Sequence, residues 1–446
     1  MVPRLLLALA VALVGCCCGA KSPGIIGRKP VTGWTTSADI SAVVGPAPAR
    51  VQPTCSNASD CSVELQAALD GCPSEVLLTQ LPAGRNWVTQ PLFVRNCKQE
   101  QRLHLSPGVV LEAIKGGFHD KGSTLLEVSN VTGFTLHGPG ATLRMHRADY
   151  NDSTKYTHSE GRMAIALRGV TNVVISGEPG NPLTVTESGG DGCYISHLFG
   201  SVPAQNSRNV TITDVNFTKN YRQGISVIGV VGLTVTNTEL SYTAGTPPQA
   251  GIDFEPDEET NELADIVFTN VTARGNMGRG FQWSLQKLTP ATPSPVSVTL
   301  NDCTVDGGHN AAVSISVNKL GLPPGGHVTF NRLQTHNSQE ILAEDKPSSL
   351  QLNIVNSSIF NVSAAAPAPI WVEGRNALCA GVHLDNVTVH DFVHRSAIDM
   401  KLGAVQGVTG DLRVINPTGC VSPHITGTGN TLKITCTRKA TANVTN

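Results

Sequence analysis

Apolar and polar residues alternate along this chain in one short pattern that occurs eight times. In each copy the third and fifth positions are almost always apolar, whereas the fourth and sixth positions vary. A period of two places successive side chains on opposite faces of a β-strand, so each copy predicts a strand with one buried face. The copies are DGCYISH from Asp191, QGISVIG from Gln223, AGIDFEP from Ala250, RGFQWSL from Arg279, AAVSISV from Ala311, QEILAED from Gln339, APIWVEG from Ala368 and SAIDMKL from Ser396.

A second series of short apolar runs alternates with the first. Its members are Phe134–Leu136, Val173–Ile175, Val210–Ile212, Leu233–Val235, Ile266–Phe268, Val298–Leu300, Val328–Phe330, Leu352–Ile354 and Val382–Leu384. Most are followed within two residues by an acid or amide (Asp214, Asn237, Asn270, Asp302, Asn356, Asn386) and then by another short run. Asn and Asp tolerate left-handed backbone angles, so these residues predict a ladder of turns.

Each repeat therefore holds three short strands and has no room for a helix. Such a unit cannot bury its apolar face alone, so it must stack on its neighbours. We predict an all-β fold, a parallel β-helix of roughly eleven three-strand coils from about Leu103 to Ile434. Hairpin turns every 8–12 residues, as in a propeller or sandwich, have little support in this sequence.

The two ends of the chain depart from the repeat. Residues 1–20 contain an apolar run after one Arg and predict a secretory signal peptide, although a bacterial lipoprotein site at Cys16 is an alternative. Residues 21–61 are interpreted as an extended arm, 62–102 as an N-terminal cap with the first strands, 103–436 as the β-helix and 437–446 as a tail. Within the cap, helical spacing from Ser62 to Gly71 predicts a short capping helix with Ser62 as its N-cap.

Cysteines and glycosylation sequons favour a secreted or cell-surface glycoprotein. Nine cysteines follow the leader, four near the start of the repeats and three near their end, where disulfides would pin the terminal coils. Cys193 falls on an inward position and predicts a buried free thiol. Among ten Asn-x-Ser/Thr sequons, Asn57, Asn151 and Asn443 are the better candidates, whereas Asn270, Asn356 and Asn386 are expected to be buried in the turn ladder.

The composition of the chain narrows the classes of partner and ligand that it could bind. A net charge of −2 with 15% charged residues argues against a nucleic-acid partner, which requires a basic stripe. No stretch approaches the length of a transmembrane helix. The cysteines lack zinc spacing. We expect a monomer.

Four segments resemble the amino-terminal section of the pectin-lyase-like superfamily, in particular its polygalacturonase and related branches. They are Glu64–Cys72, Leu81–Gly84, Val88–Phe93 and Leu103–Leu111. The resemblance covers most of Ser62 to Cys436 at the level of fold. It implies a right-handed helix, secretion and an acidic polysaccharide bound along one sheet.

The catalytic motifs of those relatives are absent. The N-T-D, D-D, G-H-G and R-I-K motifs of polygalacturonases are missing, and Gly307–Asn310 matches the histidine motif only in part. Gly251–Pro256 is similar to the Y-G-F-D-P-H motif of mannuronan epimerases but lacks its tyrosine and histidine. Catalytic residues are therefore not carried over from either family.

The repeat itself locates a candidate site. Aligned copies place two outward columns on one sheet; the first holds Tyr194, Ser226, Asp253, Gln282, Ser314, Leu342, Trp371 and Asp399, and the second holds Ser196, Ile228, Glu255, Ser284, Ser316, Glu344, Glu373 and Lys401. Coils lie about 4.8 Å apart, and residues two apart on a strand lie about 6.6–7 Å apart. Ionisable residues converge on three or four adjacent coils: Asp191, Arg222, Asp253, Glu255, Asp257, Arg279 and His309.

Two chemistries fit this cluster. In hydrolysis, one carboxylate protonates the glycosidic oxygen and the other activates water; the spacing of Asp253 and Glu255 matches that of inverting enzymes. In β-elimination from a uronide, Arg222 or Arg279 would remove a proton while Asp253, Glu255 and Asp257 hold Ca²⁺. A hydrolase would need no cofactor. The alternative without a catalytic role is that these charged residues only form ion pairs in a solvated loop where the strand ends.

The candidate catalytic residues are thus Asp253, Glu255, Asp191 and Arg222. Candidate substrate contacts are Tyr194, Asp257, Arg279, His309 and Trp371, and the loop Arg144–His158 is a candidate wall of the groove. Trp283 points inward and belongs to the core. Two classes of function stay open: a secreted enzyme that cleaves an acidic polysaccharide, and a non-catalytic glycan-binding or structural surface or matrix protein.

Overall fold

The computed structural model describes residues 50–57, 59–317, 325–400, 403–423 and 427–437. The expected signal peptide, most of the arm and all but the first residue of the tail lie outside these residues. Everything below concerns the unit that spans residues 46–446.

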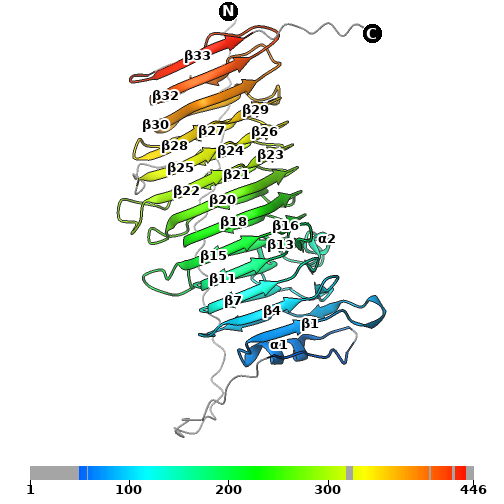
Figure 1. Ribbon diagram of the computed structural model, residues 1–446. Helices are drawn as coiled ribbons and strands as arrows, with labels where there is room; N and C mark the ends of the chain where they lie inside the picture. Colours follow the sequence, from blue (N-terminus) through cyan, green and yellow to red (C-terminus); the bar gives the residue numbers. More distant parts are fainter. Residues whose placement is uncertain (1–49, 58, 318–324, 401–402, 424–426, 438–446) are drawn as a thin grey trace, which may run out of the picture. The chain divides into compact units, whose positions relative to one another are not determined.

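Parallel strands stack in three ranks, of which the first carries the eight-fold pattern (Figure 1). Each strand pairs in parallel with its counterpart in the next coil. The first rank comprises β3 (Leu92–Arg95), β6 (Leu126–Ser129), β10 (Ile165–Arg168), β14 (Cys193–Ser196), β17 (Gln223–Val227), β19 (Ala250–Phe254), β21 (Phe281–Ser284), β24 (Val313–Ser316), β27 (Ile341–Glu344), the start of β30 (Ile370–His390) and β31 (Ile398–Asp399).

The second rank contains the second apolar series. Its strands are β1 (Glu75–Leu78), β4 (Gln101–Leu105), β7 (Thr132–His137), β11 (Thr171–Ser176), β15 (Ser207–Thr213), β18 (Val230–Ser241), β20 (Leu263–Arg274), β22 (Val296–Asn301), β25 (Gly326–Asn331), β28 (Leu350–Val355), the middle of β30, β32 (Gly403–Ile415) and β33 (Thr431–Thr437). Their pairing is also parallel throughout.

The third rank follows the turn ladder. It comprises β2 (Trp87–Thr89), β5 (Val110–Ala113), β8 (Thr142–Arg144), β12 (Leu183–Thr186), β16 (Val215–Thr218), the ends of β18 and β20, β23 (Thr304–Asp306), β26 (Gln334–His336), β29 (Ser358–Phe360) and the end of β30. Three parallel strands in each repeat confirm the predicted right-handed parallel β-helix.

The predicted turn ladder is present. Asp214, Asn237, Asn270, Asp302, Asn356 and Asn386 all have φ between 49° and 55°, the left-handed region that Asn and Asp tolerate. Their side chains bond from coil to coil: the Asn270 amide donates to Asn237 Oδ1 at 2.8 Å, and Asn386 donates to Asn356 Oδ1 at 2.8 Å. The expectation that Asn270, Asn356 and Asn386 are buried is wrong, because the turns lie on the outside of the coil and these side chains are exposed.

The inward side chains of the three ranks form one continuous apolar core. Trp283 is fully buried, as predicted, and stacks on Phe254 with 4.8 Å between ring centroids. Cys193 is a buried free thiol, as are Cys303 and Cys379. The core thus fills the coil where the sequence pattern places apolar residues.

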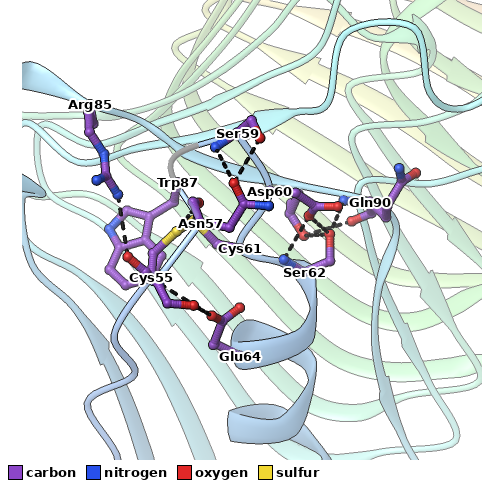
Figure 2. The surroundings of a disulfide bond; sticks show 12 residues. Cys55, Asn57, Ser59, Asp60, Cys61, Ser62, Glu64, Arg85, Trp87 and Gln90 are labelled. Atoms are coloured by element: carbon purple, nitrogen blue, oxygen red, sulfur yellow. Dashed lines mark hydrogen bonds between the residues drawn. A yellow bond between two sulfur atoms is a disulfide. The ribbon is translucent and has the colours of Figure 1, made fainter.

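Helix α1 (Ser62–Asp70) covers the first coil and confirms the predicted capping helix. Ser62 is not its N-cap, however; Cys61 occupies that position, and Ser62 N donates to Asp60 Oδ1 at 2.9 Å. Figure 2 shows Ser62 turned instead toward the first coil, where its hydroxyl accepts a hydrogen bond from Gln90 N at 2.7 Å. Asp60, one residue before Cys61, therefore takes the polar role expected of Ser62.

Disulfides lie at both ends of the repeats, as the cysteine spacing predicted. Cys55 bonds to Cys61 (Figure 2) and Cys72 to Cys97 at the N-terminal end, whereas Cys420 bonds to Cys436 at the other. A terminal coil has only one neighbour, so a covalent link there limits fraying. No helix in the described part of the chain is long and apolar enough to cross a membrane.

One insertion between coils adds structure that the sequence did not indicate. The stretch Arg144–His158, predicted to be a loop, contains the short helix α2 (Arg147–Tyr150), and β9 (Gly161–Arg162) then pairs antiparallel with β13 (Gly189–Gly190). A further short helical turn, η1 (Pro82–Gly84), lies in the first coil. Arg147 Nη1 donates to the Ala244 carbonyl at 3.2 Å, so the insertion is tied to the turns ahead of β17 and β19.

Candidate active site

The first predicted column is in register along its whole length. Tyr194, Ser226 and Asp253 pair in successive strands, and the pairing continues through Gln282 and Ser314 to the later coils. A period-two pattern shared by all copies fixes this register, because a shift of one residue would expose the core face. The sequence therefore placed these side chains correctly relative to one another.

The surroundings of this column differ from the open, solvated face that one interpretation assumed. Asp253, Ser226 and Asp191 have no exposed surface, and Tyr194 is also buried. Glu255, whose side chain is 32% exposed, and Asp257 reach the surface, and Arg222 is partly exposed.

Arg222 lies at the centre of the carboxylates. Its Nη2 donates to Glu255 Oε2 at 2.7 Å, its Nη1 lies 3.7 Å from Asp191 Oδ2, and its Nε lies 3.3 Å from Glu160 Oε2. Burial alone would lower the pKa of Arg222, but the charges of Asp191 and Glu255 outweigh it and raise the pKa above its ordinary value. Arg222 is therefore a fixed cation that holds three acidic side chains from three different segments.

Asp253 occupies the most desolvated position. Burial, followed by the nearby charge of Glu255, raises the pKa of Asp253 well above its ordinary value. Its Oδ2 accepts a hydrogen bond from Gln223 Nε2 at 3.0 Å, and Gln223 Oε1 in turn accepts from Ala250 N at 2.9 Å. Asp253 is thus a positioned carboxyl group whose raised pKa favours the protonated form relative to an exposed aspartate.

Asp191, which lies just ahead of β14 and two coils before Asp253, has a similar environment. Burial raises its pKa to about 6, although Arg222 opposes the shift. Neither of its carboxyl oxygens, nor Asp253 Oδ1, has a hydrogen-bond partner among the described residues. Buried polar atoms are almost always hydrogen-bonded, so unpartnered oxygens on two neighbouring acids mark a position where a ligand or water would complete the bonds.

A second group borders the cluster on the side of β14. The Tyr194 hydroxyl donates to Asp257 Oδ2 at 3.4 Å, and desolvation followed by the charge of Glu255 raises the pKa of Asp257. Burial of Tyr194 keeps its hydroxyl protonated, because burial raises its pKa above the ordinary value. His197 lies 3.7 Å from Glu258 Oε1 and contacts Asn261 at 3.0 Å, which orders the strand exit.

Arg279 borders a small pocket rather than the carboxylates. A cavity of about 360 Å³ lies over β21 and β24, next to Asp253 in the column; its polar lining includes Arg279, Gln282, Ser284, Ser314, Ser316 and Glu344. Arg279 Nη1 donates to Gln282 Oε1 at 3.0 Å, while its buried Nε has no hydrogen-bond partner among the described residues. The pocket therefore offers amide, hydroxyl and guanidinium groups beside the acidic cluster.

Comparison with known proteins finds solved structures that are similar to this β-helix, although sequence comparison finds none. No protein-family model matches the chain, and no curated protein matches its sequence. The A-module of mannuronan C-5 epimerase AlgE4 from Azotobacter vinelandii is similar in structure, with a TM-score of 0.54 and 14% identity over 85% of this chain and 98% of that one. The chain therefore shares the parallel β-helix fold of this module.

Two further β-helix neighbours have different activities. A family 28 exopolygalacturonase from Yersinia enterocolitica gives a TM-score of 0.51 with 12% identity over 87% of this chain and 78% of that one. PfbA, a surface adhesin of Streptococcus pneumoniae, gives 0.52 with 12% identity over 86% and 90%. At these identities the likeness concerns the pectin-lyase-like fold alone.

The remaining predicted residues of this β-helix lie away from the cluster. His309 is exposed in a turn, and its described hydrogen bonds run through its backbone to Asn276 and Gln339. Trp371 lies four strands beyond Asp253 in the same column, about 19 Å away at the usual strand spacing. Lys401 lies outside the described residues. The structure thus unites Asp191, Arg222, Asp253 and Glu255, with Tyr194 and Asp257 adjacent, and does not unite them with His309 or Trp371.

Several residues of the site were missed by the sequence reasoning. Gln223 and His197 stand inside the repeated pattern, at its first and seventh positions, so the alignment of Gln223 with Asp191 was available as a signal. Glu160 lies in the insertion between coils and reaches Arg222 only through the tertiary fold. No repeat predicts such a contact.

The acidic side chains do not form a ready metal site. Within the described residues, no three His, Cys, Asp or Glu side chains are grouped to hold a metal ion. Glu255 and Asp191 both face Arg222, and one Asp253 oxygen accepts from Gln223. The Ca²⁺ arrangement considered for β-elimination therefore does not fit these contacts, and no step is derived through it.

Proposed function

We propose that this β-helix is a secreted carbohydrate-active enzyme that hydrolyses an acidic polysaccharide at the cluster around Arg222. The observation that carries the proposal is the pair of buried acids, Asp191 and Asp253, with raised pKa values and unpartnered oxygens. Strongly perturbed acids beside a polar pocket are typical of catalytic sites. Carbohydrate-active neighbours of the same fold agree with this reading.

The roles follow from the two environments. Asp253, whose pKa is raised, would donate a proton to the glycosidic oxygen, whereas Glu255 lies at the surface beside Arg222 and would activate water. Residues two apart on a strand are separated by about 6.6–7 Å, which falls within the separation of about 6.5–9.5 Å used by inverting glycosidases. Sugar must pack against Glu255 to reach Asp253, because Asp253 has no exposed surface.

Hydrolysis is favoured over β-elimination. As the base of an elimination, Arg222 would have to lose its proton, but it lies among three carboxylates that favour its protonated form. Its role in the proposal is electrostatic: it keeps Glu255 oriented and compensates the acidic charge. Arg279, at the neighbouring pocket, is the candidate partner for a sugar carboxylate.

A second candidate function is glycan binding without catalysis. A hollow of about 840 Å³ lies over β4, β7, β11 and β15, lined by threonine, asparagine and charged side chains that include Lys98 and Arg102. A surface adhesin is among the structural neighbours. Such a surface would suit a carbohydrate ligand without any need for the acidic cluster.

The discriminating experiment incubates the purified protein with polygalacturonate, mannuronan and a neutral glucan, with and without chelator. New reducing ends without ultraviolet absorbance of unsaturated uronate would support hydrolysis. Absorbance together with new ends would establish elimination and overturn the proposed roles. If none of the polymers yields reducing ends or ultraviolet absorbance, the result would favour a glycan-binding protein without catalysis.

A further inference from the structure

An exposed aromatic ring stands beside the acidic cluster without a role in the mechanism above. Phe199 lies in the connection between β14 and β15 and is 55% exposed. Val202 in the same connection is almost fully exposed. Isolated exposed apolar residues are common, so exposure alone assigns Phe199 no function.

The ring of Phe199 is, however, held in place by neighbouring side chains. The Arg168 guanidinium lies 3.9 Å from its centroid and 5.2 Å from that of Tyr194. The rings of Tyr194 and His197 approach Phe199 edge-on, with centroid distances of 6.4 and 5.8 Å. A ring already ordered by a cation and two aromatic edges loses little further freedom when a ligand binds.

The support beneath Phe199 is rigid as well. Arg168 is itself buried and lies 3.5 Å from Glu127 Oε2. Met163, Ala166, Tyr194 and Ile228 form a small buried apolar cluster separate from the main core. Ala166 and Arg168 lie on β10 and Tyr194 lies on β14, and both strands precede β19, the strand of Asp253, in the same rank.

The ring of Phe199 is linked to the candidate acids through one residue. Tyr194 contacts Phe199 and also donates its hydroxyl to Asp257. In the first column Tyr194 precedes Asp253 by two strands, about 10 Å at the usual spacing. A polysaccharide lying along the column would therefore pass both Phe199 and Glu255.

We propose that Phe199 is the stacking platform of a sugar subsite on the N-terminal side of the acidic cluster, and that it takes the C–H face of a pyranose ring. This inference rests on the proposed polysaccharide substrate. A pyranose ring presents C–H groups on its faces, and these match the negative face of an aromatic ring. Arg168 covers the inner side of Phe199 and is engaged by Glu127, so recognition at this subsite depends on ring shape and not on sugar charge.

The test is affinity electrophoresis of the full chain in gels containing polygalacturonate or mannuronan. Phe199→Ala should weaken the binding of the retarding polymer by about 10-fold, and Phe199→Trp should retain it. Phe392→Ala is the matched control, because Phe392 is 62% exposed but lies in a turn after β30. Unchanged retardation of Phe199→Ala, or no retardation of the wild-type protein by either polymer, would overturn the platform.

A second variant separates this inference from the proposed catalysis. Glu255→Gln should be retarded like the wild-type protein while it releases no reducing ends. If Glu255→Gln cleaves normally, the proposed hydrolytic roles fail and the platform stands. If Phe199→Ala binds normally while Glu255→Gln is inactive, the platform alone fails.

Discussion

At the scale of single residues, the site is defined by one buried cation among several acids. Asp191, Glu160 and Glu255 reach Arg222 from three segments, and burial strengthens the interaction with Asp191 most. The same burial penalises charge on Asp253 and Asp191, so these acids keep protons that exposed acids would lose. The carboxyl groups of the cluster thereby lie in different environments, as acid–base catalysis requires.

Loss of the central cation should therefore be costly. Arg222→Met leaves Asp191 and Glu255 without their compensating charge, and we expect a loss of about 3–5 kcal/mol in the free energy of unfolding. Arg332→Met is the matched control, because the Arg332–Asp302 pair is about half exposed on both sides. Such a surface pair should contribute at most about 1 kcal/mol. Equal losses in the two variants, measured by urea unfolding, would contradict the central role of Arg222.

The raised pKa of Asp191 predicts a pH dependence of stability. Its folded-state value of about 6 exceeds the ordinary 3.8, so protonation favours the folded state. The contribution is fully present below about pH 4 and is lost as the pH rises through 6. We expect the stability difference between the wild-type protein and Asp191→Asn to change across this window. Denaturant unfolding of both at pH 4 and pH 7 checks it; a difference that does not vary with pH would refute the assignment.

At the scale of strands and turns, the repeat dictates the structure. Strand register followed from period two, and the ladder residues followed from the preference of Asn and Asp for left-handed angles. The contacts of Glu160 with Arg222 and of Arg147 with Ala244 were not predictable, because the segments that make them meet only in three dimensions. Phe199 was missed for a related reason: it lies in a connection that carries no repeated pattern.

The ladder itself makes a prediction about turns. Asn270 has φ of 54° and donates to Asn237, so Asn270→Ala should lose both a tolerated backbone angle and a hydrogen bond. We expect about 1–2 kcal/mol of destabilisation from the strain alone. Asn270→Gly relieves the backbone strain and isolates the hydrogen bond. Thermal or urea unfolding should rank stability as wild type, then Gly, then Ala; an Ala variant at least as stable as Gly would contradict this account.

At the scale of the whole β-helix, stacking and function use opposite faces of the same strands. Inward residues of every coil join one core, whereas outward residues of the first rank differ from coil to coil. The acidic cluster, the polar pocket beyond it and Phe199 before it all lie along that rank. A linear polymer is the ligand that such a row accommodates without any change of fold.

The central claim is that Asp253 supplies a proton in polysaccharide hydrolysis. The most direct test measures the release of reducing ends and the melting temperature of Asp253→Asn beside the wild-type protein. The account predicts at least about 100-fold slower turnover with a nearly unchanged melting temperature, because an amide of nearly the same size cannot donate the proton. Normal turnover would contradict the catalytic role, and a loss of folding would show that Asp253 is needed for the structure instead.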